Sequence, residues 1–506
     1  MKVALLLAIV CAGIFFRALD RDLNHDEHQF LAPAALLSRE GLLPYRDYPL
    51  FHLPNLVLLY AALDRLTGEL LLSAKLVSVA STAVVAILLG LTALRRGSAE
   101  SPRGRWWLAG AVLALFLCDP LTVETTGKTW NHELPAMLTV AALLLHGRAG
   151  QRDSLPCMAG SGVLLGLAIG TRLTFAPIGI PLALFPLLFA LPRRRRWAHC
   201  ATFCAAGVIA SAPSLYFLCA DREAFIFGNL EFPRLRLLDP ENTRIRKTMT
   251  WWRKLRYFGK EIVLPSWPLF TAYALLGVRP AIAWCRTRRS EAMAGALLLS
   301  VLPFALLGCF APSRYQYQHY YLFAPLLALG TLFGATEDRG ADAGRKRSRT
   351  LLLASALGSI LWLLGRSVRA DGLGAFEWLG RIGRPAETFP AKAKAVGRSI
   401  RDLVPAGKVL TLAPTWVLEG GLKIYPEFAT GPFAWRSASF APPESRPRLK
   451  LIAPADLEAL LASDPPAAIL TGVEDAALEK PLVAFAEAHG FRAVPLAKRR
   501  VLWLPR

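Results

Sequence analysis

Long apolar runs recur along the first 365 or so residues of the chain, and arginines, prolines or loop residues bound each run. Because a bilayer core of about 30 Å needs roughly 20 apolar residues in a helix, these runs predict membrane-spanning helices. We expect about eleven spans. They are residues 3–18, 71–94, 106–118, 132–146, 157–170, 173–191, 200–219, 263–284, 291–310, 320–334 and 350–365.

The last part of the chain has a different pattern, in which short strand-like runs alternate with helical ones and proline, glycine and charged residues increase. We therefore expect a mainly α, polytopic membrane domain over residues 1–370 and a small α/β domain over residues 371–506. The pattern leaves open whether this tail binds an acceptor or only caps the structure. The predicted strands are residues 408–412, 467–471 and 499–504, and the predicted helices are residues 456–462 and 482–489.

Composition and charge agree with a membrane protein, since 54% of the residues are hydrophobic, 19% are charged and the mean hydropathy is +0.37. The net charge of +22 would suit nucleic acid, but the positive residues form short blocks between apolar runs. That is the pattern of cytoplasmic loops. It argues against nucleic acid, and it predicts an inner-membrane protein with its C-terminal domain outside. The blocks are Arg95–Arg105, Arg193–Arg196, Arg286–Arg289 and Arg345–Arg349.

Candidate chemistry is concentrated in the predicted first outer loop, residues 19–70. Asp26 and Glu27 form an acidic pair between His25 and His28, a few residues beyond the first span. A carboxylate at this depth can take a proton from a hydroxyl group. His25, His28 and His52 could also be metal ligands, because imidazole and carboxylate together suit a divalent ion, although such histidines more often only form hydrogen bonds. No cofactor is certain from the motifs, and a divalent metal is possible.

The rest of this loop is expected to follow the membrane surface. From residue 29 to residue 40 apolar side chains recur at helical spacing and Gly41 follows as a stop, so an interfacial helix is predicted. A second apolar helix ends near Gly68. The segment between the two helices carries Arg46, Asp47 and His52.

The order of several motifs carries a family resemblance. After the acidic pair come Tyr-Arg-Asp-Tyr-Pro at residues 45–49 and Phe-His-Leu-Pro-Asn at residues 51–55. Asn-His-Glu-Leu-Pro at 131–135 opens a span, a glycine-punctuated helix over 160–172 ends in Thr-Arg, and Gln-His-Tyr-Tyr-Leu at 318–322 precedes another span. The arrangement resembles the GT-C superfamily, and especially its bacterial protein-mannosyltransferase-like and aminoarabinose-transferase-like branch.

The resemblance, over roughly residues 1–335, implies a hexosyl- or pentosyltransferase with a polyprenyl-phosphate sugar donor, an outward-facing site and inversion at the anomeric carbon. The acceptor could be a lipid, a glycan or a protein. Asp26 is expected as the catalytic base, with Glu27 as the second choice. His52 stands where the family commonly has a lysine, which leaves the phosphate contact there open. The predicted substrate-binding residues of these motifs are Arg46, Asp47, His52, Lys128, Asn131, Arg172, Arg314 and His319.

The predicted second outer loop, residues 220–262, is rich in positive charge on the side that should be poor in it. We expect an anionic ligand, either lipid headgroups in general or the donor phosphate. The cations of this loop are Arg234, Arg236, Arg244, Arg246, Lys247, Arg253, Lys254 and Arg256. Those predicted to bind the donor are Arg244, Arg246, Arg253 and Arg256.

Two other classes of protein are compatible with a polytopic chain. A secondary transporter or lipid flippase is the main alternative, but transporters often have two similar halves and broken helices at the midplane. No such repeat is visible in this sequence, and its polar clusters lie at one membrane face. A non-catalytic scaffold that presents the tail domain is the third interpretation, and it would not need an acidic first loop.

Overall fold

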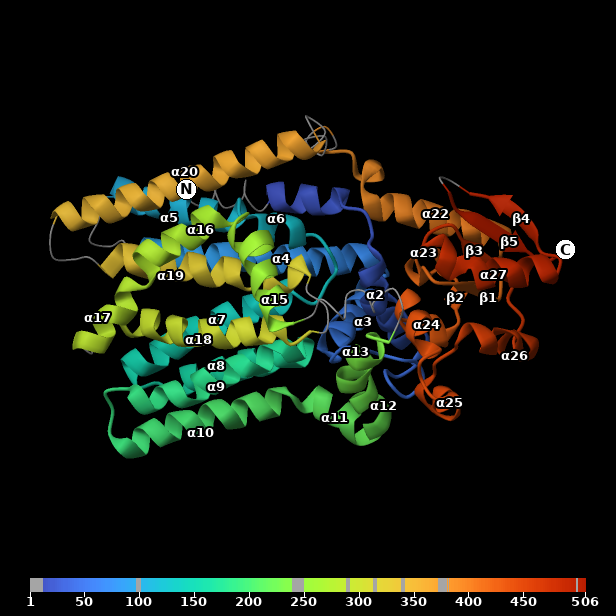
Figure 1. Cartoon of the computed structure of the whole chain (residues 1–506), viewed down its shortest axis with the longest axis horizontal. Helices are drawn as coiled ribbons and strands as arrows, with labels where there is room; N and C mark the ends of the chain where they lie inside the picture. Colours follow the sequence, from blue (N-terminus) through green and yellow to red (C-terminus); the bar gives the residue numbers. More distant parts are fainter. Residues whose placement is uncertain are drawn as a thin grey trace.

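A bundle of long helices carries a small α/β domain at one end (Figure 1). This is the mainly α architecture with a C-terminal sheet that the sequence predicts. The computed structural model describes residues 12–96, 102–238, 250–287, 292–312, 316–337, 342–371, 380, 382–496 and 499–506.

Most helices of the bundle run along the long axis of the molecule (Figure 1). The bundle helices are α4 (Leu70–Arg96), α5 (Pro102–Leu117), α7 (Glu133–Arg152), α8 (Leu155–Thr171), α9 (Gly179–Leu184), α10 (Arg193–Ala210), α11 (Ala212–Ala220), α16 (Trp267–Ala272), α17 (Arg279–Thr287), α18 (Met293–Phe310), α19 (Phe323–Glu337) and α20 (Asp342–Asp371). By length and hydropathy, four segments of the described chain could each cross a membrane, and α10 with α11, bent by 52°, form a fifth if counted as one. The protein is a multi-pass membrane protein, and the total of about eleven spans stays a prediction.

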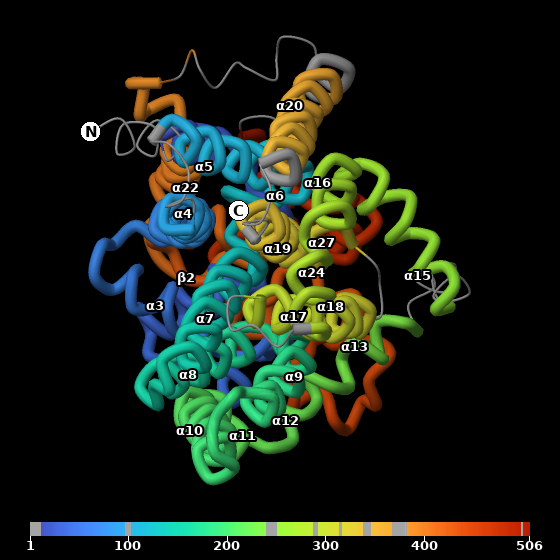
Figure 2. Tube along the Cα trace, turned by 90° about the vertical axis from the view of Figure 1, so that its left-hand side faces the viewer, coloured from blue at the N-terminus to red at the C-terminus, as the bar shows by residue number. Residues whose placement is uncertain are grey.

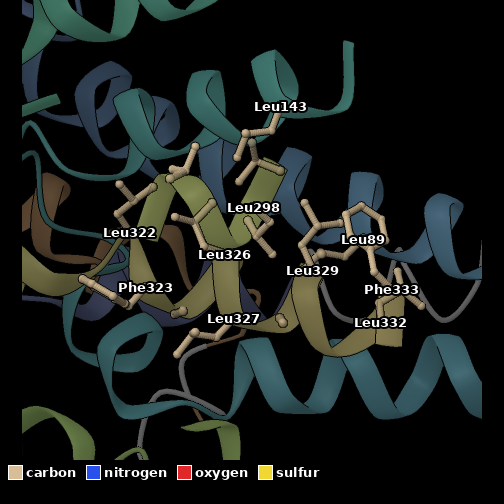
Figure 3. Close-up of a cluster of buried hydrophobic side chains, with 14 of the residues drawn as sticks. Leu89, Leu143, Leu298, Leu322, Phe323, Leu326, Leu327, Leu329, Leu332 and Phe333 are labelled. Carbon is tan, nitrogen blue, oxygen red and sulfur yellow. The ribbon is translucent and has the colours of Figure 1, made fainter. Parts of the chain in front are cut away.

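Helix α19 lies in the centre of the bundle, with α4, α5, α7 and α18 around it (Figure 2). Lipid is as apolar as leucine, so close packing rather than the hydrophobic effect must hold such helices together in a membrane. The side chains at this contact (Figure 3) include Leu89, Leu143, Leu298, Leu322, Phe323, Leu326, Leu327, Leu329, Leu332 and Phe333.

The glycine-punctuated helix α8 packs directly against α10. A Cβ atom on Gly162 would lie 2.3 Å from the carbonyl oxygen of Phe203, and one on Gly166 would lie 2.5 Å from that of Gly207. Only glycine therefore allows the two backbones to approach this closely. The contact fixes α8, and with it the position of Arg172, the residue that ends the helix.

The first outer loop forms the two helices that the sequence predicts. Helix α2 (His25–Ala35) continues as the π-helical turn η1 (Leu36–Glu40) and ends at Gly41 with φ +71°. Helix α3 (Asn55–Thr67) ends at Gly68 with φ +69°. Helix α2 begins at residue 25 rather than at the expected residue 29, because Asn24 caps it.

Short helices fill the other loops on this side of the bundle. They are α6 (Pro120–Thr125), α12 (Arg222–Ile226), α13 (Phe232–Leu235) and α15 (Trp251–Tyr257). Other short turns are η3 (Leu173–Ile178), η4 (Phe185–Leu188), η5 (Phe227–Glu231), η6 (Phe258–Val263), η7 (Tyr273–Gly277) and η9 (Tyr317–Tyr320).

The C-terminal domain is built on a five-stranded sheet in the order β2-β1-β3-β5-β4. Strand β1 pairs parallel with β2 and β3, whereas β5 pairs antiparallel with β3 and β4. The predicted strands and helices of the tail are confirmed, and β2, β4, α22 and several short helices were not predicted. The elements are α22 (Phe389–Leu403), β1 (Lys408–Thr411), α23 (Pro414–Leu418), β2 (Lys423–Ile424), α24 (Pro432–Ala438), α25 (Arg446–Leu449), α26 (Leu457–Ser463), β3 (Ala468–Thr471), α27 (Ala476–Ala488), β4 (Arg492–Pro495) and β5 (Val501–Leu504).

The C-terminal domain shares one hydrophobic core with the first outer loop. Buried side chains of α2 such as Leu31 pack in the same cluster as Ile400 of α22 and Val417 of α23. A hydrogen bond of 2.8 Å between His28 Nδ1 and Thr415 Oγ1 crosses the same contact. The domain is therefore part of the support of α2. The boundary at residues 370 and 371 stays a prediction.

A buried lysine fixes the start of the first outer loop from the membrane side. The ammonium group of Lys75 on α4 donates to the carbonyl oxygens of Ala18 (3.2 Å), Arg21 (2.9 Å) and Gly127 (2.9 Å). Three carbonyl groups satisfy all three donors of an ammonium group. Lys75 thereby joins the end of the first helix to the segment before α7, which carries further candidate residues.

Candidate active site

The amino terminus of α2 positions Asp26. The side chain of Asn24 accepts a hydrogen bond from the backbone N–H of Asp26 (2.9 Å), and Glu27 Oε1 accepts one from the backbone N–H of Asn24 (2.8 Å). This reciprocal capping box fixes the first turn of the helix. Only 15% of the Asp26 side chain is exposed. A carboxylate in the first turn is favoured by the helix dipole.

Glu27 points elsewhere, although it is adjacent in sequence. It is fully buried, and its Oε2 accepts hydrogen bonds from the backbone N–H (2.8 Å) and the hydroxyl group (2.9 Å) of Thr129. Its carboxylate therefore ties α2 to the segment before α7. The two carboxylates of the expected acidic pair therefore have different surroundings. Glu27 connects two segments of the fold, whereas Asp26 faces a cavity.

Asp26 lines a cavity of about 550 Å³, called the site cavity below. Its wall combines residues of the first outer loop, the segment before α7, the break after α8, the second outer loop, the segment before α19 and the C-terminal domain. The polar lining residues are Asp26, Gln29, His52, Asn131, His132, Arg172, Thr174, Asn229, Arg234, Arg236, Gln316, Gln318 and His319. The apolar ones are Phe30, Phe51, Leu53, Trp130, Leu173, Pro177, Leu230, Phe232, Pro233, Leu237, Ala311, Pro312 and Phe433.

A chain of hydrogen bonds crosses the floor of the site cavity. The Gln29 amide donates to the backbone oxygen of Asp26 (3.1 Å), so its Oε1 accepts from His52 Nε2 (2.9 Å). His52 Nδ1 is then free to accept from the Asn131 amide (3.4 Å), whose oxygen accepts from Arg172. This sequence of donors and acceptors requires a neutral His52 with its proton on Nε2.

Burial lowers the pKa of His52 to about 3, and the positive charges of Arg172 and Arg236 act in the same direction. His52 is therefore uncharged at neutral pH. It cannot supply the positive charge of a lysine at this position, and it acts instead as a hydrogen-bonding link. The positive charge of the cavity comes from other residues.

Those residues are arginines. Arg172 follows α8 in an extended conformation (φ −153°, ψ 114°), and its Nε donates to the hydroxyl group of Thr174 (2.9 Å). Arg234 and Arg236, at the end of α13, line the same cavity from the second outer loop. The guanidinium carbon of Arg236 lies 4.9 Å from the ring centroid of Phe433. Three arginines thus line a cavity in which Asp26 is the acidic lining residue.

His319, also predicted from the sequence, lies beside His132 on the far wall, with 5.8 Å between the ring centroids. Burial and then the charge of Arg172 hold the pKa of His319 well below its usual value. Both histidines lie near guanidinium groups, so neutral imidazoles fit this wall better than charged ones.

Several predicted residues lie away from the site cavity. Arg46 and Asp47 form an ion pair (2.9 Å) at a turn, where Asp47 also accepts from the Leu43 N–H (2.7 Å). Lys128 lies over the ring of Trp130, 5.4 Å from its centroid. None of the three is among the described residues that line the cavity.

The cations of the second outer loop also differ in whether they line the site cavity. Arg253 and Arg256 lie on α15 with exposed side chains, outside the lining of the site cavity. The loop residues that do line the cavity are Arg234 and Arg236. Arg244, Arg246 and Arg314 lie outside the described residues.

Some lining residues were not predicted. Gln29 lies three residues after Asp26, so the two side chains share one face of α2. This spacing could have identified Gln29 if the helix had been predicted to begin before Asp26 rather than at residue 29. Arg236 was noted only as one of many loop cations. Phe433 comes from the C-terminal domain, and nothing in its local sequence indicates that it reaches a cavity of the membrane domain.

The three histidines considered as metal ligands are separated. Within the described ranges, no three His, Cys, Asp or Glu side chains are grouped as a metal site. His28 Nδ1 is bonded to Thr415, and both nitrogens of His52 are within hydrogen-bonding distance of protein groups. In this arrangement these two histidines serve as hydrogen-bonding groups.

The sequence of this region matches a known family. A family model described as Glycosyltransferase family 87 matches residues 29–309, more than half of the chain. The chain belongs to glycosyltransferase family 87. The matched segment begins at Gln29 and ends just before the lining residue Ala311. It therefore includes Asn131, Arg172 and Arg236 of the site cavity. Membership makes this protein a glycosyltransferase.

Solved structures show the same fold. ArnT from Cupriavidus metallidurans bound to undecaprenyl phosphate has a TM-score of 0.60 at 16% identity, over 99% of this chain and 98% of that one. The apo state of ArnT gives 0.58 at 16% identity, over 99% and 97%. A search of curated protein sequences found no match. The family 87 match and this fold confirm the resemblance to the GT-C superfamily, and they do not favour the transporter or flippase interpretation.

Proposed function

We propose that this family 87 enzyme transfers a sugar from a polyprenyl-phosphate carrier to an acceptor at the outer face of the membrane, with inversion of the anomeric carbon. The observation that carries the proposal is the site cavity, in which Asp26 and three arginines share one space with an apolar wall. The similar fold of ArnT, crystallised with undecaprenyl phosphate, supports a carrier of this class.

The two kinds of lining suit the two parts of such a donor. Guanidinium groups bind phosphate through paired N–H donors, and Arg172, Arg234 and Arg236 present them. The stacked rings of Phe51 and Phe232, 3.5 Å apart, belong to the apolar wall that an isoprenoid chain would contact. The sugar would then lie between the arginines and Asp26.

The reaction follows from that placement. The acceptor oxygen attacks the anomeric carbon as the bond from this carbon to the phosphate oxygen breaks, and the electron pair of that bond leaves with the phosphate. The arginines stabilise the negative charge that develops on the leaving phosphate. Asp26 takes the proton of the acceptor hydroxyl group. A single displacement of this kind inverts the anomeric configuration.

The orientation of the protein in the membrane is part of the proposal. The end of α4 and the starts of α5, α10 and α20 lie at the end of the bundle opposite to the C-terminal sheet (Figure 1). These ends carry the arginine blocks, so the positive-inside rule places them in the cytoplasm. The site cavity and the C-terminal domain then lie outside. A reporter enzyme that works only outside the cytoplasm should be active when it is fused after Arg506. Activity of a fused reporter that works only in the cytoplasm would contradict this orientation.

The proposed donor class is tested with purified protein in liposomes. We expect a polyprenyl-phosphate sugar, offered from a panel with different sugars, to be consumed with release of polyprenyl phosphate when a membrane extract supplies acceptors. The corresponding nucleotide sugars are the control and should not be consumed. Consumption of a nucleotide sugar without any polyprenyl phosphate present would refute the donor class.

A further inference from the structure

A second cavity lies on the other side of the α2 amino terminus, between the first outer loop and the C-terminal domain. Its volume is about 530 Å³, close to that of the site cavity. The loop contributes Asp22 and His25 to its lining, and the C-terminal domain contributes Glu474, Arg499 and Arg500. The reaction as described above leaves this space without a role.

The chemistry of the second cavity suits a neutral, hydroxyl-rich ligand. Asp22 and Glu474 place carboxyl groups beside the guanidinium groups of Arg499 and Arg500, so an anionic ligand would meet acidic as well as basic side chains. A sugar hydroxyl both donates and accepts hydrogen bonds, and it can satisfy carboxyl and guanidinium groups at once. The guanidinium carbon of Arg500 lies 3.8 Å from the ring centroid of Trp416. This stacking holds the guanidinium group, a hydrogen-bond donor, in place.

The acidic side of the cavity is held rigidly by the protein. The Glu479 carboxylate accepts hydrogen bonds from the backbone N–H groups of Gly472 (2.6 Å), Val473 (3.2 Å) and Glu474 (3.0 Å). Burial raises the pKa of Glu474 to about 7, although the charge of Arg436 opposes the shift. Near neutral pH the Glu474 carboxyl group can therefore donate a hydrogen bond as well as accept one.

One side chain connects the second cavity with the catalytic carboxylate. His25 lines the second cavity, and its Nε2 lies 3.4 Å from Oδ1 of Asp26, which lines the site cavity. The His25 side chain is 46% exposed, and its ring centroid lies 5.9 Å from that of Phe433, which lines the site cavity. A hydroxyl group bound next to His25 at the edge of the second cavity would thus lie near the Asp26 carboxylate.

We infer that the second cavity binds the saccharide part of the acceptor, a neutral sugar or short glycan whose hydroxyl group is presented to Asp26. This inference rests on the proposed function, because it names the acceptor class of the same reaction. It also gives the C-terminal domain a role in acceptor recognition. The same sugar chemistry could come from a free glycan or from the headgroup of a glycolipid.

The test measures binding of simple sugars to the full-length protein in lauryldimethylamine oxide, a detergent without sugar groups. Methyl glycosides of several neutral hexoses and pentoses are offered at millimolar concentration, and binding is read by saturation-transfer NMR. We expect at least one glycoside to bind the wild-type protein. Val473→Trp should abolish this binding by filling the cavity, and Glu474→Gln should weaken it about 5- to 10-fold through loss of one hydrogen-bonding mode.

Two controls test whether the effects on glycoside binding are specific to the second cavity. Glu487→Gln, on the exposed face of α27, should bind the glycoside like the wild type. Undecaprenyl phosphate binding should be the same in all four proteins. An octyl glycoside that binds at least ten times more tightly than its methyl counterpart would assign the ligand to a glycolipid, and equal affinities would assign it to a free glycan.

Two outcomes would overturn the inference: no glycoside binds the wild-type protein, or Val473→Trp binds it undiminished. Loss of the glycoside from a Leu230→Trp variant, which fills the site cavity, with retention in Val473→Trp would move the sugar to the site cavity and also overturn it. If glycosides bind as expected but undecaprenyl phosphate does not bind at all, the proposed donor is wrong and the second cavity remains a sugar site.

Discussion

Replacement of Asp26 by asparagine is expected to lower the turnover of a polyprenyl-phosphate sugar by about 100- to 10,000-fold, the usual effect of losing a general base. The amide keeps the size of the side chain but cannot take the acceptor proton. Because Asp26 faces the site cavity, and its carboxylate pairs within the described part of the chain only with the adjacent His25, binding of polyprenyl phosphate and thermal stability should stay near those of the wild type. Turnover, donor binding and melting temperature of purified variants provide the measurement.

Glu27→Gln is the matched control, one residue further along the same helix. Its amide nitrogen would face a donor group, since the Glu27 carboxylate accepts from the N–H and hydroxyl groups of Thr129 and from the N–H of Asn24. An unsatisfied buried donor costs about 1–3 kcal/mol. The melting temperature should therefore fall, with a smaller effect on turnover than Asp26→Asn. An inactive Glu27→Gln beside a fully active Asp26→Asn would assign the base to Glu27.

Arg172→Gln is expected to weaken binding of polyprenyl phosphate about 10- to 150-fold, because a charge-assisted hydrogen bond in a buried site is worth about 1.5–3 kcal/mol. The substitution also removes the donor to Asn131, whose amide bonds to His52. Arg172→Lys keeps the charge but not the planar fork, so an intermediate affinity is expected. Native mass spectrometry with undecaprenyl phosphate measures each affinity.

The exposed arginines of the second loop provide the comparison. Arg253 and Arg256 are solvent-exposed on α15, where a charge contributes little after screening. The double variant Arg253→Gln/Arg256→Gln should therefore change donor affinity far less than Arg172→Gln. If the double variant loses as much affinity as Arg172→Gln, α15 must reach the donor, as the sequence prediction held. If Arg172→Gln binds undecaprenyl phosphate normally, the phosphate does not lie in the site cavity as proposed.

Local sequence was sufficient for the features that depend on near neighbours. Apolar runs and arginine blocks define the bundle, because lipid requires long apolar helices whatever their neighbours are. The helices of the first outer loop end where Gly41 and Gly68 take positive φ, a conformation that glycine adopts without strain. The strands of the tail followed from short alternating runs. Asp26 could be proposed because it stands just beyond a span.

Only the tertiary structure decided which polar residues face the same space. Adjacent residues point in directions about 100° apart on a helix, so one turn of α2 sends Asp26 to the site cavity and Glu27 into the core. The hydrogen-bond chain through His52, Asn131 and Arg172 joins segments that are 79 and 41 residues apart in sequence.

The same limit explains the arginines of the second loop and the contribution of the C-terminal domain. Charge alone gave the loop an anionic ligand, but only the packing of α13 beside the ring of Phe433 brings Arg236 to the cavity. Buried polar groups must find partners wherever the fold places them, and those partners come from distant segments. The sequence by itself therefore determined the class of protein and predicted the membrane face of its chemistry, whereas long-range packing decided which residues belong to the site.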